Sequence, residues 1–391
     1  EVPRIRAFRH TNHQEVVEEG AKPEREPDIY SIPRWRWARV EAAHDARRQV
    51  EKQLDGNYPV WVTDDNNGEK MIVIEQPDDG NLRSADVRAL DERVPASVKG
   101  VAGRQSRFGR KSRYAQEREI PVDIERPKLD GGQKENTSAE QFKMAENSSN
   151  HSLDSSIETS ESIYYEYDYE KIPAGAHMYA TDSNMRDATH VTTGFPVYDG
   201  SESKMLSSGH TFNSQLDRGW VDDNITQGED GGDLHEESVV FDPYDGDFDP
   251  LDATLMEIGP SASGTKHAFA AEGGGYRSTS IWGSLTQDRL NDIQDSGTGA
   301  HGTLMKQGSM NGRDECSITG VTDRAFKTDL VGGDDIEGGD SGGPIAEVRD
   351  VPWMGRKYAY GAGLISSNPK DATYVYGSAM HAIEEEFSVT V

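Results

Sequence analysis

The stretch Gly339-Asp340-Ser341-Gly342-Gly343-Pro344 decides which fold and which chemistry are expected of this 391-residue chain. A serine framed by glycines can place its hydroxyl beside two backbone N–H groups, here those of Gly339 and Ser341. Preorganised donors of this kind stabilise the charge on a carbonyl oxygen under attack by about 2.7–4 kcal/mol each. The glycines permit backbone angles that a Cβ would forbid. The stretch therefore predicts a nucleophile with its oxyanion hole, or else only a glycine-rich turn before a strand over 345–348.

A nucleophilic serine needs a histidine that takes its proton and a carboxylate that orients the histidine. Among the eleven histidines, His210 stands out because it ends the run 204–210, which begins with apolar residues typical of a strand and ends in small residues. The stretch 194–200 ahead of it indicates another strand followed by a turn. A histidine on such a corner can project toward a cleft. We therefore predict His210 as the general base, the alternative being an ordinary loop histidine.

The orienting carboxylate must come from an acid-rich stretch. Asp252 leads directly into an apolar strand over 253–258, where a carboxylate can be buried at a strand edge. Its neighbours Asp245, Asp247 and Asp249 are typical of a solvated acidic loop, or of a cation site with alternating oxygen ligands. We select Asp252, and Asp247 or Asp249 remain alternatives for this position.

With these residues in place, roughly residues 172–391 resemble a chymotrypsin-like serine peptidase, nearest to the bacterial streptogrisin and α-lytic type. The family order His, Asp, Ser is met by His210, Asp252 and Ser341. Further stretches that resemble family segments, in order, are 306–312, 318–321, 360–367 and 379–391. The resemblance implies an all-β double six-stranded antiparallel β-barrel over 171–391. It also implies hydrolysis of polypeptide substrates through an acyl-enzyme, with no metal and no organic cofactor.

The substrate pocket follows from the same resemblance. Asp335 lies six residues before the nucleophile, where an acid in trypsin-like members selects Arg or Lys. Gly338, Ser366 and Ser367 are the other residues expected to contact substrate. The chain departs from the family in its cysteines, because Cys316 is the only one and no intrachain disulfide can form.

The charge of the chain is the strongest compositional signal. The formal net charge is −29, and residues 1–125 contain 22 basic and 24 acidic residues whereas residues 126–391 contain 19 and 46. Molar salt shortens the Debye length to about 3 Å and removes the self-repulsion of such a surface. We therefore expect a halophilic, haloarchaeal protein. Binding of nucleic acid by the acidic part is disfavoured for the same reason.

The N-terminal part, residues 1–127, is expected to form a small α+β domain. A helix is predicted over 34–54 and another over 82–92, with strands over 58–63, 71–75 and 120–124. The resemblance implies that this part is a pro-region. The basic cluster over 104–113 is interpreted as a solvated connector or as a face that docks on the acidic catalytic domain, with a nucleic-acid patch as the alternative. Residues 128–170 are predicted to be a polar flexible linker, and a processing site is expected within about 130–190.

The remaining expectations concern location and alternatives. The sequence has no run long enough to span a membrane, and no signal peptide opens it at Glu1. An extracellular or cell-surface location is inferred from the family alone. Two alternatives stay open: a non-catalytic or autoinhibited binding module with the same barrels, and an acidic surface protein in which the glycine-framed serine is only a turn.

Overall fold

The computed structural model places most of the chain, and the fold is described for the parts that it places. These are residues 1–54, 58–65, 67–75, 90–103, 116–125, 169–181, 188–210, 225–226, 234–241, 251–259, 262–271, 275–299, 302–331, 338–351, 356–367 and 374–391. Asp245, Asp247, Asp249 and Asp335 lie outside these residues, as do the basic cluster over 104–113 and almost all of the expected linker.

Six antiparallel strands in the C-terminal half close into a barrel. Each strand pairs with the next, and the last pairs with the first. In barrel order they are β17 (Gly302–Gly308), β18 (Gly312–Val321), β19 (Ala325–Leu330), β22 (Tyr374–Ala379), β21 (Arg356–Ser367) and β20 (Pro344–Val351). Buried side chains such as Phe326, Ile345 and Leu364 form its core. The all-β prediction for this part of the chain is confirmed, together with one closed six-stranded barrel.

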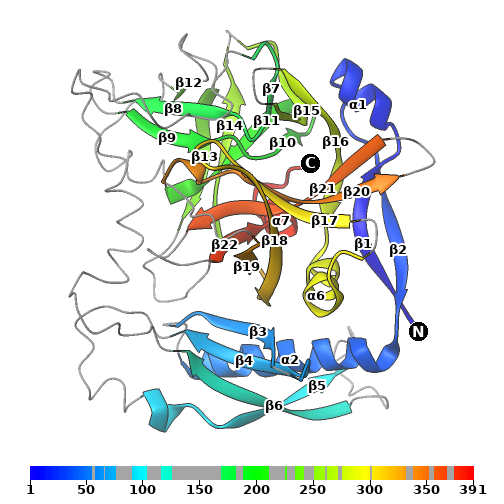
Figure 1. The fold of residues 1–391 in the computed structure, drawn as a ribbon, viewed down its shortest axis with the longest axis vertical. Coiled ribbons are helices and arrows are strands. Elements are labelled where there is room, and N and C mark those ends of the chain that lie inside the picture. The colour runs from blue at the N-terminus through cyan, green and yellow to red at the C-terminus, as the bar shows by residue number, and fades with distance from the viewer. Residues whose placement is uncertain are drawn as a thin grey trace.

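A second, seven-stranded antiparallel sheet lies beside the barrel (Figure 1). Its order is β10 (Pro196–Asp199), β11 (Glu202–Ser207), β14 (Asp252–Ile258), β13 (Leu234–Phe241), β12 (Ile225–Thr226), β8 (His177–Thr181) and β9 (Ala188–Thr192). Within the described residues the end strands β10 and β9 are not paired with each other. A second closed barrel therefore stays a prediction.

The N-terminal part contains a long helix on a sheet. Helix α2 (Arg34–Gln53) buries Ala42, Ala46 and Val50 against Val62 and Ile72 of that sheet. The sheet order is β3 (Val60–Asp64), β4 (Lys70–Glu75), β6 (Gln116–Glu125) and β5 (Ser97–Ala102). The helix expected over 34–54 and the three expected strands correspond to α2, β3, β4 and β6.

Ahead of α2 the chain forms a hairpin that the sequence analysis did not predict. Strands β1 (Val2–His10) and β2 (Arg25–Ile32) flank α1 (His13–Glu19), and β1 pairs antiparallel with β16 (Tyr276–Leu285). Gly283 on β16 makes this close pairing possible, since a Cβ there would overlap the carbonyl oxygen of Phe8. In Figure 1 the hairpin runs along one edge of the molecule, between α1 and α2. The first residues of the chain thereby extend the sheet that contains β21.

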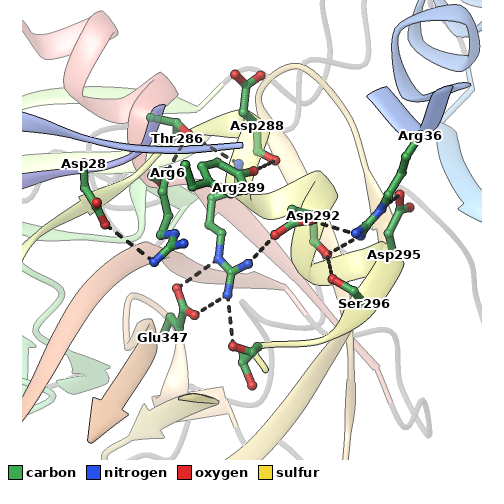
Figure 2. A network of polar contacts seen from close by, with 12 residues as sticks. Arg6, Asp28, Arg36, Thr286, Asp288, Arg289, Asp292, Asp295, Ser296 and Glu347 are labelled. Atoms are coloured by element: carbon green, nitrogen blue, oxygen red, sulfur yellow. Dashed lines mark hydrogen bonds and ion pairs between the residues drawn. The ribbon is translucent and has the colours of Figure 1, made fainter. Parts of the chain in front are cut away.

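Helix α6 (Gln287–Ser296) follows β16 and is the centre of a polar network between these parts (Figure 2). Arg36 of α2 forms ion pairs of 3.0 Å with both Asp292 and Asp295. On the other side Arg289 donates to both carboxylate oxygens of the buried Glu347 on β20.

The remaining elements are β7 (Ile172–Ala174), β15 (Thr265–Ala270), η1 (Gly338–Asp340) and α7 (Met380–Phe387). No helix within the described residues is both long and apolar enough to cross a membrane.

Candidate active site

Asp252 and His210 form a buried pair between β14 and the corner after β11. Asp252 is the first residue of β14 and only 3% exposed. Its Oδ2 accepts a 2.7 Å hydrogen bond from His210 Nδ1, and its Oδ1 accepts a 2.7 Å bond from the backbone N–H of His210. Because Nδ1 carries the proton in this bond, Nε2 is the unprotonated nitrogen of the neutral ring.

Two serines of the barrel hold Asp252 from the other side. Ser366 Oγ on β21 donates to Oδ2 at 2.7 Å, and the backbone N–H of Asp252 donates to Ser378 Oγ on β22 at 2.8 Å. The pair is thus fixed by both sheets, at the place where they meet. Ser366 was expected to contact substrate, but its hydroxyl is engaged with the carboxylate.

Ser341 follows η1 and sits in a turn that two strands hold in place. Its carbonyl oxygen accepts from Thr192 N on β9 at 3.0 Å, and Gly342 N donates to Ile365 O on β21 at 2.8 Å. Ile365 N in turn donates to Gly343 O at 2.8 Å. Gly342 has φ +83°, and a Cβ there would overlap Ser207 Oγ and the Thr192 carbonyl oxygen. Only glycine fits this position without strain.

Strand β21 connects the serine turn to the His–Asp pair. Ile365 bonds Gly342 and Gly343, the two residues after Ser341, and the next residue of the strand, Ser366, bonds Asp252. Strand β21 therefore contacts both the turn that carries Ser341 and the carboxylate of Asp252, which in turn bonds His210.

The backbone at Gly339 is also held firmly. Its carbonyl oxygen accepts from Thr192 Oγ1 at 2.7 Å and from Ser309 Oγ at 3.1 Å. A Cβ at this position would meet the side chains of Met310 and His190. Gly338, also expected to contact substrate, begins η1. Ser367 ends β21.

The sequence analysis missed the contacts of Asp340, the residue before the serine. Its fully buried Oδ1 accepts from Met310 N at 2.8 Å and Asn311 N at 3.1 Å, and Lys306 Nζ lies 3.6 Å from Oδ2. Burial raises the pKa of Asp340, while Lys306 and the two amides oppose that rise. Lys306 belongs to the stretch 306–312 that was singled out by resemblance. Its positive charge is the feature of the sequence from which an ion pair with Asp340 could have been predicted. The ion pair and amide bonds anchor the turn that carries Ser341.

Cys316 lies in the barrel core, where burial raises the pKa of its thiol to about 12. It is therefore protonated at neutral pH and serves as a small core residue. Within the described residues no group of His, Cys, Asp and Glu side chains is arranged to hold a metal ion.

Comparison with known proteins gives only distant matches. No family model and no curated protein matches the chain. Among solved structures it resembles a glutamic-acid-specific serine protease that utilises a novel histidine triad in substrate binding, with 15% identity, a TM-score of 0.35 and coverage of 56% of this chain and 100% of that one. Thermobifida fusca Protease A gives 17% identity, a TM-score of 0.36 and coverage of 56% and 97%. An alpha-lytic protease homolog gives 12%, 0.35, 56% and 98%.

Proposed function

We propose that this protein is a serine endopeptidase that hydrolyses peptide bonds through an acyl-enzyme. The observation that carries the proposal is the buried Asp252 carboxylate, which bonds both the ring and the backbone of His210 and is tied through Ser366 to the strand beside the Ser341 turn. A carboxylate in this position fixes the tautomer of the imidazole and compensates its charge when it is protonated.

In the proposed mechanism His210 Nε2 takes the hydroxyl proton of Ser341 as the oxygen attacks the substrate carbonyl. The N–H groups of Gly339 and Ser341 stabilise the oxyanion. His210 then gives the proton to the leaving amine, which yields an acyl-enzyme, and activates a water that hydrolyses it. Asp252 keeps its hydrogen bond to Nδ1 in every step. The proton taken from Ser341 passes through His210 to the leaving amine, and these steps need no metal or organic cofactor.

The proposal extends to the setting of the site. Residues 171–391 would form the double barrel, with Asp335, Gly338, Ser366 and Ser367 at the substrate pocket. Residues 1–127 would form an α+β pro-region that docks on the catalytic part, in a zymogen secreted to the cell exterior or surface. Support for docking comes from the pairing of β1 with β16 and from the ion pairs of α6.

Adaptation to high salt is part of the same proposal. The acid surplus of residues 126–391 is dispersed, so screening should stabilise the folded chain. We expect the melting temperature to rise between dilute buffer and molar salt. A melting temperature that is the same in both would remove this part of the proposal.

The peptidase function is tested with a fluorophosphonate probe, which labels an activated serine. We expect the wild type in molar salt to be labelled and Ser341→Ala to remain unlabelled. Circular dichroism on both proteins confirms that the variant is folded. Absence of labelling in the intact and in the linker-cleaved wild type would favour the non-catalytic binding module.

A further inference from the structure

Thr192, the last residue of β9, bonds the turn that carries Ser341 at two points. Its backbone N–H donates to the carbonyl oxygen of Ser341 at 3.0 Å, and its hydroxyl donates to the carbonyl oxygen of Gly339 at 2.7 Å. The side chain is fully buried. Thr192 therefore holds the peptide units on both sides of the one that carries the Ser341 N–H, which is a proposed oxyanion donor.

The Thr192 hydroxyl is itself held in place by Ser309, the residue after β17. Ser309 N–H donates to Thr192 Oγ1 at 2.9 Å, so the hydroxyl hydrogen of Thr192 is left to be donated to the Gly339 carbonyl. Ser309 Oγ adds a second bond to this carbonyl at 3.1 Å. On the strand side, Ser207 Oγ donates to the Thr192 carbonyl oxygen at 2.9 Å. Both serines are fully buried, and in such surroundings a hydrogen bond is stronger than in water.

The composition of the turn explains why contacts from outside are needed. Gly338 and Gly339 can each adopt backbone angles that are closed to other residues, so neither fixes the direction of its own N–H group. An oxyanion donor is effective only if it already points at the place where the charge develops. The direction of the donors must therefore be set by groups that bond the turn, and Thr192 supplies two of these bonds.

We propose that Thr192 is a positioning residue of the peptidase: its hydroxyl holds the Gly339 carbonyl so that the N–H groups of Gly339 and Ser341 point at the substrate oxyanion. This inference rests on the proposed peptidase function. Thr192 acts through the turn and not through a contact with the substrate. Because the donors act on charge that develops only in the transition state, loss of the hydroxyl lowers kcat and leaves KM nearly unchanged.

Thr193 provides a matched control one residue further along the chain. It is also fully buried, and its hydroxyl accepts from Ala176 N and donates to Pro173 O, both at 2.8 Å. These partners lie in the segment that begins with β7, not in the serine turn. Thr192→Val and Thr193→Val therefore each remove a buried hydroxyl that bonds one N–H and one carbonyl. Both should destabilise the protein to urea, but only Thr192→Val should slow the chemical step.

The test measures kcat and KM in molar salt with a quenched fluorescent peptide taken from a bond that the wild type cuts in denatured casein. We expect Thr192→Val to lower kcat by about 10–100-fold, less than the loss of a whole oxyanion donor, and to change KM by less than about twofold. Thr193→Val should keep the wild-type kcat, and Thr192→Ser, which retains the hydroxyl, should keep most of it. The pH dependence of kcat/KM should keep its shape in all variants, because it reports the acid–base groups of the free enzyme.

The rate of fluorophosphonate labelling is a second readout that needs no peptide, and it should fall in Thr192→Val but not in Thr193→Val. A wild-type kcat in folded Thr192→Val, an equal loss in Thr193→Val, or a loss confined to KM would overturn the inference alone. Thr192→Ala, which lacks the same hydroxyl, decides in the same way if Thr192→Val does not fold. No cleavage of casein and no labelling in the wild type would overturn the peptidase function and the inference with it.

Discussion

At the scale of single residues, every contact of the Asp252 carboxylate is with a donor. The ring and the backbone of His210 and the hydroxyl of Ser366 all donate to it. In Asp252→Asn one oxygen becomes an NH₂ group that faces these donors, so the imidazole is pushed toward the wrong tautomer. If the proposed function holds, we expect kcat to fall by about 10⁴-fold, the loss seen when the corresponding carboxylate of a serine protease is replaced by Asn.

Steady-state kinetics on a peptide substrate measure this loss. Ser366→Ala is the companion variant, and it should cost only about tenfold since it removes one donor and leaves the imidazole tautomer unchanged. A fall of less than tenfold in Asp252→Asn would show that this carboxylate does not orient the base.

Gly342 gives a second prediction at this scale, because the effect of a strained backbone angle can be measured separately from the effect of steric overlap by a Cβ. Gly342 and Gly200 both have positive φ, +83° and +57°, but only at Gly342 would a Cβ overlap its neighbours. Gly200→Ala should lower the free energy of unfolding by about 1 kcal/mol through strain alone. Gly342→Ala should lower it by clearly more and abolish labelling of Ser341. Equal effects of both in urea unfolding would contradict the tight packing of the turn against β9 and β11.

At the scale of elements, three histidines, of which His10 and His267 are buried, lie between the N-terminal hairpin and β15. His10 of β1 and His13 of α1 have ring centroids 6.1 Å apart, and His267 of β15 lies 5.8 Å from His10. His10 Nε2 also bonds Val391 O at 2.8 Å. Burial lowers the pKa of His10 and His13 to about 4 and that of His267 well below its usual value. Arg25, Arg356 and Lys266 lower these pKa values further.

Acid should therefore destabilise the fold through this cluster. The unfolded chain takes up protons near pH 6.5 while the folded histidines do not, so stability is complete above about pH 6.5 and falls toward pH 4, by about 1.4 kcal/mol per pH unit for each proton. Urea unfolding between pH 7 and 4.5 at fixed salt measures this slope. His10→Gln should reduce it, and a slope unchanged by this substitution would contradict the prediction.

The elements also show what the sequence could and could not predict. Ser341, His210 and Asp252 were selected from local patterns: a glycine frame, a small-residue corner and a strand start. Helix α2 was predicted from its apolar spacing. Strands β1 and β2 were not predicted because arginines and acids alternate with their few apolar residues, and because β16, the partner of β1, is more than 260 positions away.

The contacts that hold the site were not predicted either, because their partners also lie far apart in the sequence. Thr192 and Ser378 look like ordinary strand residues in the sequence, and Ser366 was predicted only as a substrate contact. Only the closing of the sheets brings these residues to the serine turn and to Asp252. The choice of Asp252 over Asp247 and Asp249 could not be made with certainty from local pattern, because all three precede the same strand.

At the scale of the whole molecule, ion pairs join the N-terminal part to the rest, and in most of them the cation belongs to the N-terminal part, Lys327 with Glu75 being a pair of the opposite direction. The N-terminal cations meet acids of the C-terminal half: Arg4 with Asp288, Arg36 with Asp292 and Asp295, Arg47 with Asp323, and Lys70 with Asp295. Most of these groups are largely buried, so salt screens them less than exposed pairs. Strand β1 adds backbone hydrogen bonds to β16.

Cleavage within the expected linker over 128–170 should therefore leave both pieces associated. After limited proteolysis of the full chain in molar salt, we expect two fragments on a denaturing gel but one peak in size-exclusion chromatography. Separation should require urea, because it would expose the β16 edge and leave Asp295 without Lys70 and Arg36. Arg36→Ala combined with Lys70→Ala should lower the urea concentration at which the fragments separate. A cleaved N-terminal fragment that elutes alone in molar salt would show instead that this part is released once the linker is cut.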